Sequence, residues 1–266
     1  MRIVQNYHRH SIYTNIRIPD SVAKNEDYAK RAQELGHGII SSVEHGFQGR
    51  YIETFELAKQ YGLKFLFGTE AYWVRDRFEK DRTNAHIILL AKNEDGRKAI
   101  NRILSEANMT GFYYQPRIDL SLILSLPKDD VWVTTACIAF WRYDDEQIIV
   151  DLHNHFGRNF FLEVQYHDTD SQKSLNAKIS SLARRHNIQL IAGFDSHYIT
   201  DDLAWERDEF IKSSGIVYED EQGWFLDYPD GDTAYQRFID QGILTKGQIE
   251  DALANTNIFL SVEEYH

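Results

Sequence analysis

Seven short runs of apolar residues, separated by longer amphipathic stretches, constrain the fold of this chain more than any other feature of its sequence. The runs are continuous and rich in Ile, Val, Leu and Phe, which is typical of strands buried on both faces in a parallel sheet. We therefore expect strands at residues 2–7, 38–43, 64–74, 86–92, 131–135, 159–165 and 189–194.

The stretches between and after these runs predict helices. Two of them carry clear end signals, because Gly36 and Gly62 each follow a periodic segment and suit the left-handed residue after a helix. Asp20 or Ser21 offers a side-chain cap at the start of the first helix. We expect helices at residues 21–35, 48–61, 94–108, 144–155, 171–186, 201–212, 233–241 and 246–262.

Strands that alternate with helices of this length predict an α/β fold built from repeated βαβ units. Seven strands, each followed by a helix, favour a closed, TIM-like (β/α)7 barrel over an open two-sided sheet. No glycine-rich fingerprint follows the first strand, which argues against a dinucleotide-binding fold. We interpret residues 1–266 as a single domain, in which residues 215–231 form a loop and the last two helices pack outside the barrel.

Composition excludes several classes of protein. No run approaches the 18 apolar residues that a membrane span needs, and the first residues lack the apolar stretch of a signal peptide. Cys137 is the single cysteine, so no internal disulfide can form and a cytoplasmic location is expected. The net charge of −12 argues against a protein that coats nucleic acid through bulk charge, but it permits phosphate binding through metal ions.

Eleven histidines are the other unusual feature of the composition, and several of them follow strands. Because the carboxyl ends of parallel strands meet at one rim of a barrel, side chains from distant motifs are expected to converge there. Imidazole, carboxylate and thiolate groups together suit Zn²⁺, Mn²⁺ or Fe²⁺. The residues at or near strand ends are His8, His10, Glu44, His45, Glu70, His86, Cys137, Glu163, His167, Asp195 and His197.

Single residues of this set have other interpretations. A lone cysteine is most often a small buried hydrophobe, and an isolated pair of histidines is a weak signal. Glu163 could orient a histidine or close the barrel through a salt bridge, and His167 could contact a phosphate or have no role. The other histidines lie in or beside helices or at the terminus, and we interpret them as solvated or structural: His37, His153, His155, His186 and His266.

The order of these motifs resembles the PHP (polymerase and histidinol phosphatase) family, and most closely the PHP domain at the N-terminus of bacterial DNA polymerase III α subunits. The similarity extends over nearly the whole chain. No polymerase palm, fingers or thumb lies within the 266 residues, so we expect no DNA synthesis from them. The motifs are YHRHSIY at 7–13, QELG at 33–36, SVEHG at 42–46, GTEAY at 68–72, HIILLAKN at 86–93, GFYYQPRID at 111–119, FLEVQ at 161–165, DSHY at 195–198 and ANT at 254–256.

The resemblance implies a distorted (β/α)7 barrel whose C-terminal rim carries a metal cluster of up to three divalent ions, Zn, Mn or Fe. Asp20 lies ten residues after His10, whereas the family spacing is seven, so Asn15 is the alternative ligand. The implied ligands are His8, His10, Asp20, His45, Glu70, His86, Cys137, Asp195 and His197.

The chain also departs from the family pattern near the ligands. Glu44 stands where the family has aspartate, and we expect Glu44 and Glu163 to support ligands from behind. Phe140 and Trp141 follow Cys137 where the polymerase domains have a small residue, and their bulk is expected to reshape the mouth of the site.

Such a cluster suits phosphoester hydrolysis, because two ions can bind phosphate oxygens and lower the pKa of a bridging water to roughly 7. Hydroxide held by the ligand set would then attack phosphorus in line, without a Ser-His-Asp triad. Arg117 and Arg9 are candidate phosphate contacts, and Tyr113 and Tyr114 are candidate faces for base stacking. Alternatively, these tyrosines only pack their loop onto the barrel.

Three functions fit these observations. The first is a metal-dependent 3′–5′ exonuclease or phosphodiesterase acting on nucleic acid in DNA replication or proofreading, with a separate DNA polymerase or replication protein as partner. The second is a phosphatase for a small phosphomonoester such as a nucleotide or histidinol phosphate. The third is a non-catalytic, polymerase-associated metal-binding module. The polymerase-type sequence favours the first or third over the second, and the complete ligand set favours the first over the third. Three divalent cations at one rim would reduce the formal charge to −6 and favour a site that grips a strand end.

Overall fold

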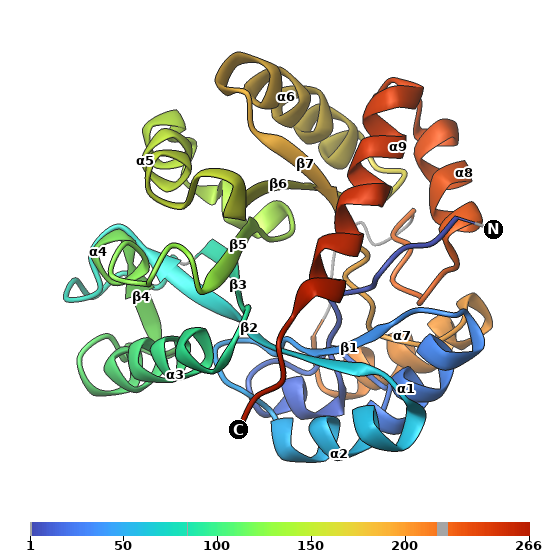
Figure 1. Ribbon diagram of the computed structural model, residues 1–266, viewed down its shortest axis with the longest axis horizontal. Coiled ribbons are helices and arrows are strands. Elements are labelled where there is room, and N and C mark those ends of the chain that lie inside the picture. Colours follow the sequence, from blue (N-terminus) through green and yellow to red (C-terminus); the bar gives the residue numbers. More distant parts are fainter. Residues whose placement is uncertain (1, 84, 217–222) are drawn as a thin grey trace.

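A single curled sheet of seven strands forms the centre of the molecule (Figure 1). The computed structural model describes residues 2–83, 85–216 and 223–266. The order of strands in the sheet is β1-β2-β3-β5-β6-β7, and the short β4 pairs with β2. The strands are β1 (Ile39–Ser42), β2 (Lys64–Val74), β3 (Ala85–Ala91), β4 (Arg117–Asp119), β5 (Val131–Thr135), β6 (Phe160–Val164) and β7 (Gln189–Ala192).

The direction of β3 differs from the prediction of an all-parallel sheet. β3 runs antiparallel to both of its neighbours, β2 and β5, whereas the other strand pairs are parallel. Only residues 75–84 separate β2 from β3, and a parallel return would need a longer crossover connection. The start of β3, with His86, therefore lies at the same edge of the sheet as the carboxyl ends of the parallel strands.

The predicted α/β class holds, but a closed (β/α)7 barrel is not confirmed, because the described residues form a half-barrel. Residues 2–7 form no strand, and the main-chain amide of Gln5 pairs with a side chain instead of a β-ladder. The amide of Gln5 donates to Thr256 Oγ1 at 2.9 Å, and Asn6 Nδ2 donates to Ser196 Oγ at 2.8 Å. One isolated bridge, between Arg9 and Ser196, links the segment to the chain after β7.

Most helices lie where the amphipathic pattern predicts them. The predicted ends at Gly36 and Gly62 are confirmed, since both glycines have positive φ (70° and 67°). The predicted helix 201–212 divides into a 3₁₀ turn and α7, and 246–262 divides into α9 and a 3₁₀ turn. The helices are α1 (Asn25–Glu34), α2 (Tyr51–Tyr61), α3 (Glu94–Met109), α4 (Leu120–Ile123), α5 (Glu146–Phe156), α6 (Asp170–His186), α7 (Ala204–Ser213), α8 (Gly231–Gln241) and α9 (Lys246–Asn255).

Helix α1 starts later than predicted, because the residues expected to cap it are used elsewhere. Its N-cap is Lys24, not Asp20 or Ser21. The Ser21 hydroxyl lies within hydrogen-bonding distance of the carbonyl oxygens of His10 (2.6 Å) and His197 (2.8 Å). Residues 17–24 thus belong to the rim of the sheet rather than to the helix.

The last two helices pack beside the far edge of the sheet. In Figure 1, α8 and α9 stand next to β7 and α6. Asn255 Nδ2 donates to the carbonyl of Leu190 in β7 at 2.8 Å, which fixes the end of α9 against the strand. Buried apolar side chains from Val4 to Tyr265 belong to one core cluster. Of the predicted loop 215–231, residues 217–222 lie outside the described residues. No helix in the described part of the chain is long and apolar enough to cross a membrane.

Candidate metal centre

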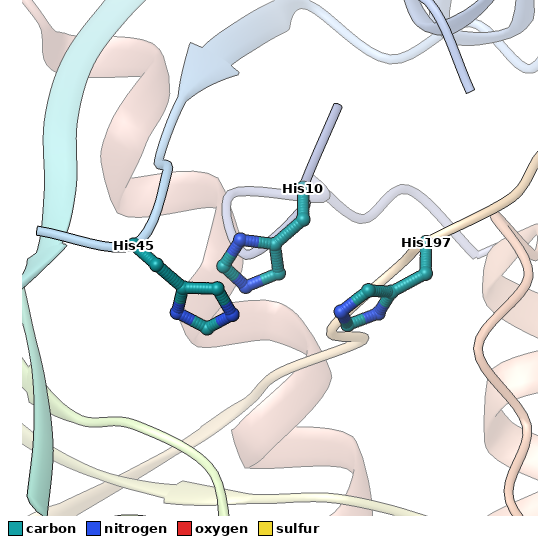
Figure 2. Close-up of side chains that lie close together, drawn as sticks. All are labelled: His10, His45 and His197. Carbon is teal, nitrogen blue, oxygen red and sulfur yellow. The ribbon is translucent and has the colours of Figure 1, made fainter. Parts of the chain in front are cut away.

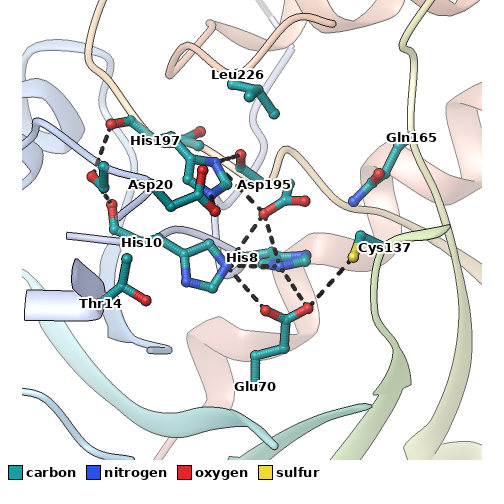
Figure 3. A network of polar contacts seen from close by, with 12 residues as sticks. His8, His10, Thr14, Asp20, Glu70, Cys137, Gln165, Asp195, His197 and Leu226 are labelled. Atoms are coloured by element: carbon teal, nitrogen blue, oxygen red, sulfur yellow. Dashed lines mark hydrogen bonds and ion pairs between the residues drawn. The ribbon is translucent and has the colours of Figure 1, made fainter. Parts of the chain in front are cut away.

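Imidazoles, carboxylates and one thiol from seven separate segments meet at one edge of the sheet. Figure 3 shows the part of this cluster around Glu70 and Asp195. Glu70, fully buried in β2, lies at their centre. Its Oε2 is 3.2 Å from His10 Nε2 and 2.7 Å from His45 Nδ1, and its Oε1 is 3.1 Å from His86 Nδ1. One carboxylate thereby faces three imidazoles from three parts of the chain.

The cluster contains three groups whose ligand atoms lie within 4.8 Å of one another. Figure 2 shows the first, in which the rings of His10, His45 and His197 gather from different loops. The other two groups are His8, His10 and Glu70, and His45, Glu70 and His86. Nitrogen and oxygen ligands bind zinc at about 2.0–2.2 Å, so two ligands of one ion lie at most roughly 4.4 Å apart. These separations therefore match shared coordination after small adjustments.

The remaining implied ligands adjoin these groups. Asp195 Oδ1 lies 3.1 Å from His8 Nε2 and 3.3 Å from His10 Nε2. Asp20 Oδ2 lies 2.9 Å from His197 Nε2. Cys137 Sγ lies 3.7 Å from both Glu70 Oε1 and His86 Nδ1. The structure thus brings all nine implied ligands together.

Several buried polar atoms in the cluster have no hydrogen-bond partner among the described residues. His45 Nδ1 and Glu70 Oε2 lie 2.7 Å apart, yet neither atom makes a hydrogen bond. His10 Nδ1 and Asp195 Oδ1 also make no hydrogen bond, although Asp195 Oδ1 lies 3.1 Å from His8 Nε2. Buried polar atoms almost always find partners, since leaving one unpaired is costly. A cation among these lone pairs would satisfy them, so the residues fit a metal.

Mutual charge, more than solvent, sets the ionisation of the cluster. Burial alone would raise the pKa of Asp195, but His8 and His10 hold that pKa well below its usual range. Burial likewise opposes charge on His45, yet Glu70 and Asp20 raise its pKa to about 10. In the metal-free chain, protons on imidazoles balance the buried carboxylates. A cation entering the site would replace those protons.

A family comparison supports this geometry: the PHP domain model matches residues 6–167. The chain belongs to the PHP domain family. Its curated relatives include the DNA polymerase III α subunits of Borreliella burgdorferi, 31% identical over 77% of this chain, and of Aquifex aeolicus, 26% identical over 71%. This PHP chain spans about a fifth of the length of those relatives, 19% and 18% respectively. Among solved structures, a candidate metal-dependent phosphoesterase from Bifidobacterium adolescentis has a TM-score of 0.49 at 14% identity, covering 93% of this chain and 99% of that chain.

The structure distinguishes the two candidate ligands of the first loop in this PHP domain. Asn15 Oδ1 accepts hydrogen bonds from the amides of Asp20 (2.8 Å) and Ser21 (3.0 Å). The side chain of Asn15 therefore holds the loop, and it is Asp20 that faces His197. The 3₁₀ turn Ile12–Ile16 takes up the longer spacing.

Arg207 is a site residue that the sequence did not reveal. It is buried in α7, and its guanidinium contacts the Asp20 side chain while Nε donates to the Asp20 carbonyl at 2.7 Å. Opposite charge from His197 and Arg207 outweighs burial and holds the pKa of Asp20 well below its usual value. No sequence motif marks Arg207, and an arginine in a predicted helix is normally expected to lie on the protein surface.

Glu163 orients a histidine, which answers the question left open by the sequence. His8 Nδ1 lies 2.8 Å from Glu163 Oε1, and the Tyr7 hydroxyl donates to Oε2 at 2.6 Å. A carboxylate at Nδ1 keeps the proton on that nitrogen and leaves Nε2 of His8 as a free ligand atom. Gly193 makes room for this carboxylate, because a Cβ there would lie 2.1 Å from Glu163 Cδ.

Glu44 supports the ligand loop instead of touching a ligand imidazole. Its carboxylate accepts hydrogen bonds from the Ser11 amide at 3.1 Å and from the Ser11 hydroxyl at 2.5 Å. These bonds fix the chain directly after His10. The extra methylene of glutamate, relative to the aspartate of the family pattern, lies against Gly49, whose added Cβ would be 2.8 Å from Glu44 Cγ.

The two arginines predicted to contact phosphate are buried in structural roles. Arg9 donates to Asn25 Oδ1 at 2.8 Å and to the Ser41 carbonyl, so it points away from the imidazoles on either side of it. Arg117 donates to three main-chain carbonyls, those of Gly111, Asp81 and Arg77, at 2.7–2.9 Å. Because both side chains are buried and their terminal nitrogens bind other parts of the chain, neither arginine is placed to bind substrate. These two predictions are corrected.

The large side chains of Phe140 and Trp141, which follow Cys137, do not lie at the mouth of the site as expected. Phe140 is buried and packs on Trp73 with ring centroids 5.5 Å apart. Trp141 is half-buried, with Lys178 Nζ 5.0 Å from its ring centroid. Phe140 therefore belongs to the core and does not reshape the mouth of the site.

Three further predicted positions differ in their exposure. His167 is buried, accepts a hydrogen bond from the Phe225 amide at 3.1 Å and stacks on Trp224. Burial lowers the pKa of His167 to about 3, so the ring is neutral. Tyr113 is half-buried, whereas Tyr114 is 58% exposed. Only Tyr114 offers a large open ring.

Proposed function

We propose that this PHP domain is a metal-dependent phosphoesterase that acts as a 3′–5′ exonuclease on nucleic acid in DNA replication. The observation that carries the proposal is a set of buried side-chain atoms on His10, His45, Glu70 and Asp195 that make no hydrogen bond. A purely structural cluster would be expected to satisfy those atoms internally. Three overlapping groups of ligands suit up to three ions.

The donor set indicates what such ions would do. When bound, divalent Zn, Mn or Fe would polarise phosphoryl oxygens and lower the pKa of a coordinated water. The chain's own residues prepare the site for this chemistry. Glu163 fixes the tautomer of His8, and Arg207 holds the carboxylate of Asp20 in place. Glu70 has its two oxygens directed at different imidazoles, which suits a ligand that bridges neighbouring ions.

Nucleic acid is the proposed substrate because of the relatives. The curated relatives named above are DNA polymerase III α subunits, and the aligned part covers most of this chain. A domain that accompanies DNA synthesis is well placed to act on a strand end. A separate DNA polymerase or replication protein is the proposed partner.

The experiment measures shortening of a 5′-labelled oligonucleotide in Mn²⁺ by the wild-type chain and by His10→Ala. The matched control is His186→Ala, which removes an imidazole at the end of α6. We expect wild type and His186→Ala to shorten the strand from its 3′ end. His10→Ala should lose both this activity and bound metal.

Other outcomes would identify a different function. Turnover of p-nitrophenyl phosphate without shortening of the oligonucleotide would indicate a phosphatase for small phosphomonoesters. Inactivity with every divalent ion, together with tight binding to a polymerase, would indicate a non-catalytic module. Unchanged metal content in His10→Ala, measured by elemental analysis, would contradict the ligand assignment.

A further inference from the structure

Tyr114 combines exposure with a strained backbone. Its φ is 63°, in the left-handed region that large side chains rarely occupy, and 58% of the residue is exposed. A bulky residue held there without burial gains little packing to offset the strain. Such outliers cluster at sites that bind ligands.

The ring of Tyr114 is held firmly in place. The guanidinium of Arg82 lies over the ring, 3.8 Å from its centroid, and contacts the hydroxyl. The rings of Tyr113 and Tyr114 lie nearly perpendicular, at 88°, with centroids 4.8 Å apart. Arg117 ties the two segments together, since it donates to carbonyls of both residues 77–81 and Gly111. The aromatic ring is therefore presented in one orientation, with little conformational freedom to lose on binding.

The same loop adjoins the metal centre. Along one edge of β2, His45 pairs with Glu70, and Arg117 then pairs with Tyr72, two residues further on. A Cβ on Gly46, the residue after His45, would lie 3.3 Å from Pro116 Cγ. Tyr114 is thus two residues from a side chain that packs directly behind a candidate ligand.

The surroundings of Tyr114 are aromatic and cationic. Phe112 is 54% exposed and Phe78 is 66% exposed, on the two segments that Arg117 joins. Residues 75–83 and 111–117 carry five cationic side chains and three acidic ones, in a chain whose net charge is −12. Exposed rings beside arginines are the pattern by which proteins bind single-stranded nucleic acid. Arg117 is buried and Arg77 is paired with Asp119, so it is Arg82, beside the ring of Tyr114, that is placed to contact a phosphate backbone.

We propose that Tyr114, with Phe112 and Phe78, forms a stacking surface for the bases of a single-stranded nucleic acid whose end lies in the metal centre. The choice of ligand rests on the proposed function. The surface would select single strands, because the bases of a duplex are stacked on one another and cannot reach the rings.

The test measures binding of a fluorescein-labelled oligothymidylate with phosphorothioate linkages, which resists hydrolysis, by fluorescence anisotropy in Mn²⁺. The variant is Tyr114→Asn, which removes the ring and suits the left-handed backbone, so the fold should be retained. Tyr114→Phe keeps the ring. Trp205→Ala is the control, because Trp205 is 62% exposed but lies in α7, far from β4 in Figure 1.

We expect Tyr114→Asn to raise the dissociation constant about five- to hundredfold, as for loss of one stacked base. Tyr114→Phe and Trp205→Ala should bind nearly as wild type does, and duplex should bind more weakly than single strand. Unchanged binding by Tyr114→Asn, equal affinity for duplex, or no binding by wild type would overturn the proposal. Binding with this pattern but no hydrolysis of an ordinary oligonucleotide would refute the exonuclease and leave the stacking surface standing. Hydrolysis of an ordinary oligonucleotide, together with unaltered binding by Tyr114→Asn, would support the exonuclease and refute the stacking surface.

Discussion

Glu163 Oε1 lies 2.8 Å from His8 Nδ1, and both side chains are fully buried. Replacing Glu163 with glutamine should lower metal affinity about 10- to 100-fold, because the carboxylate both fixes the tautomer of His8 and raises its basicity. Metal titration followed by elemental analysis measures the effect. Glu250→Gln, on the exposed face of α9, should bind metal as wild type does. Equal affinities for Glu163→Gln and wild type would mean that His8 is not a ligand.

Gly193 controls the same contact from the other side. An alanine there would place its Cβ 2.1 Å from Glu163 Cδ, so the carboxylate would have to move. We expect Gly193→Ala to weaken metal binding to a similar degree and to destabilise the fold by roughly 1–3 kcal/mol, as overpacking does. Gly247→Ala is the matched control, since an added Cβ in α9 meets nothing within 4 Å. Thermal unfolding of the two variants, with and without metal, provides the measurement. Normal metal affinity in Gly193→Ala would show that Glu163 can hold His8 from another position.

As the pH rises from 7 to 10, the stability of the metal-free fold should decrease, whereas the affinity for metal should increase. Burial opposes protonation of His45, but Glu70 and Asp20 raise its pKa to about 10, above the unfolded value near 6.5. This pair therefore stabilises the metal-free fold fully below about pH 6.5, and the contribution is lost as the pH rises through about 10. The carboxylates Asp20, Glu70 and Asp195 have lowered pKa values, so their contribution is lost only in strong acid.

Because a metal ion must displace the proton from His45, apparent metal affinity should increase as the pH rises from 7 to 10. Calorimetry in buffers of different ionisation enthalpy would count the protons released. Metal binding that is independent of pH over this range, without proton release, would contradict the shifted pKa of His45.

The sequence predicted most of the site because metal-ligand motifs are local. His8 and His10 point to the same side because side chains two residues apart lie on one face of an extended chain. Six of the seven predicted strands were found near their predicted positions. The sequence also placed His86 at the start of its strand, although an all-parallel barrel would have put that end at the wrong rim. The antiparallel direction of β3 removes this conflict.

What the sequence did not predict depends on distant contacts. Arg117 and Arg207 are both arginines beside the site, and their types alone do not tell which one faces a ligand. Arg117 is committed to three carbonyls of its own loops, whereas Arg207 contacts Asp20, 187 residues away in the sequence. The open barrel has the same origin, because Gln5 and Asn6 find side-chain partners that no local pattern reveals.

The loop between the first strand region and α1 provides the last prediction. Asp20→Asn should lower both activity and metal content more than Asn15→Ala, because only Asp20 faces His197 and His45, at 2.9 and 3.7 Å. Asn15→Ala should keep the ligand set but loosen the loop, since it removes the hydrogen bonds to the amides of Asp20 and Ser21. We expect the Asn15→Ala defect to shrink at high metal concentration, whereas the Asp20→Asn defect should persist, because a neutral amide cannot replace the charge that faces the imidazoles. Activity measured across a metal titration separates the two effects, and a larger, metal-resistant defect in Asn15→Ala would show that Asn15 is the ligand.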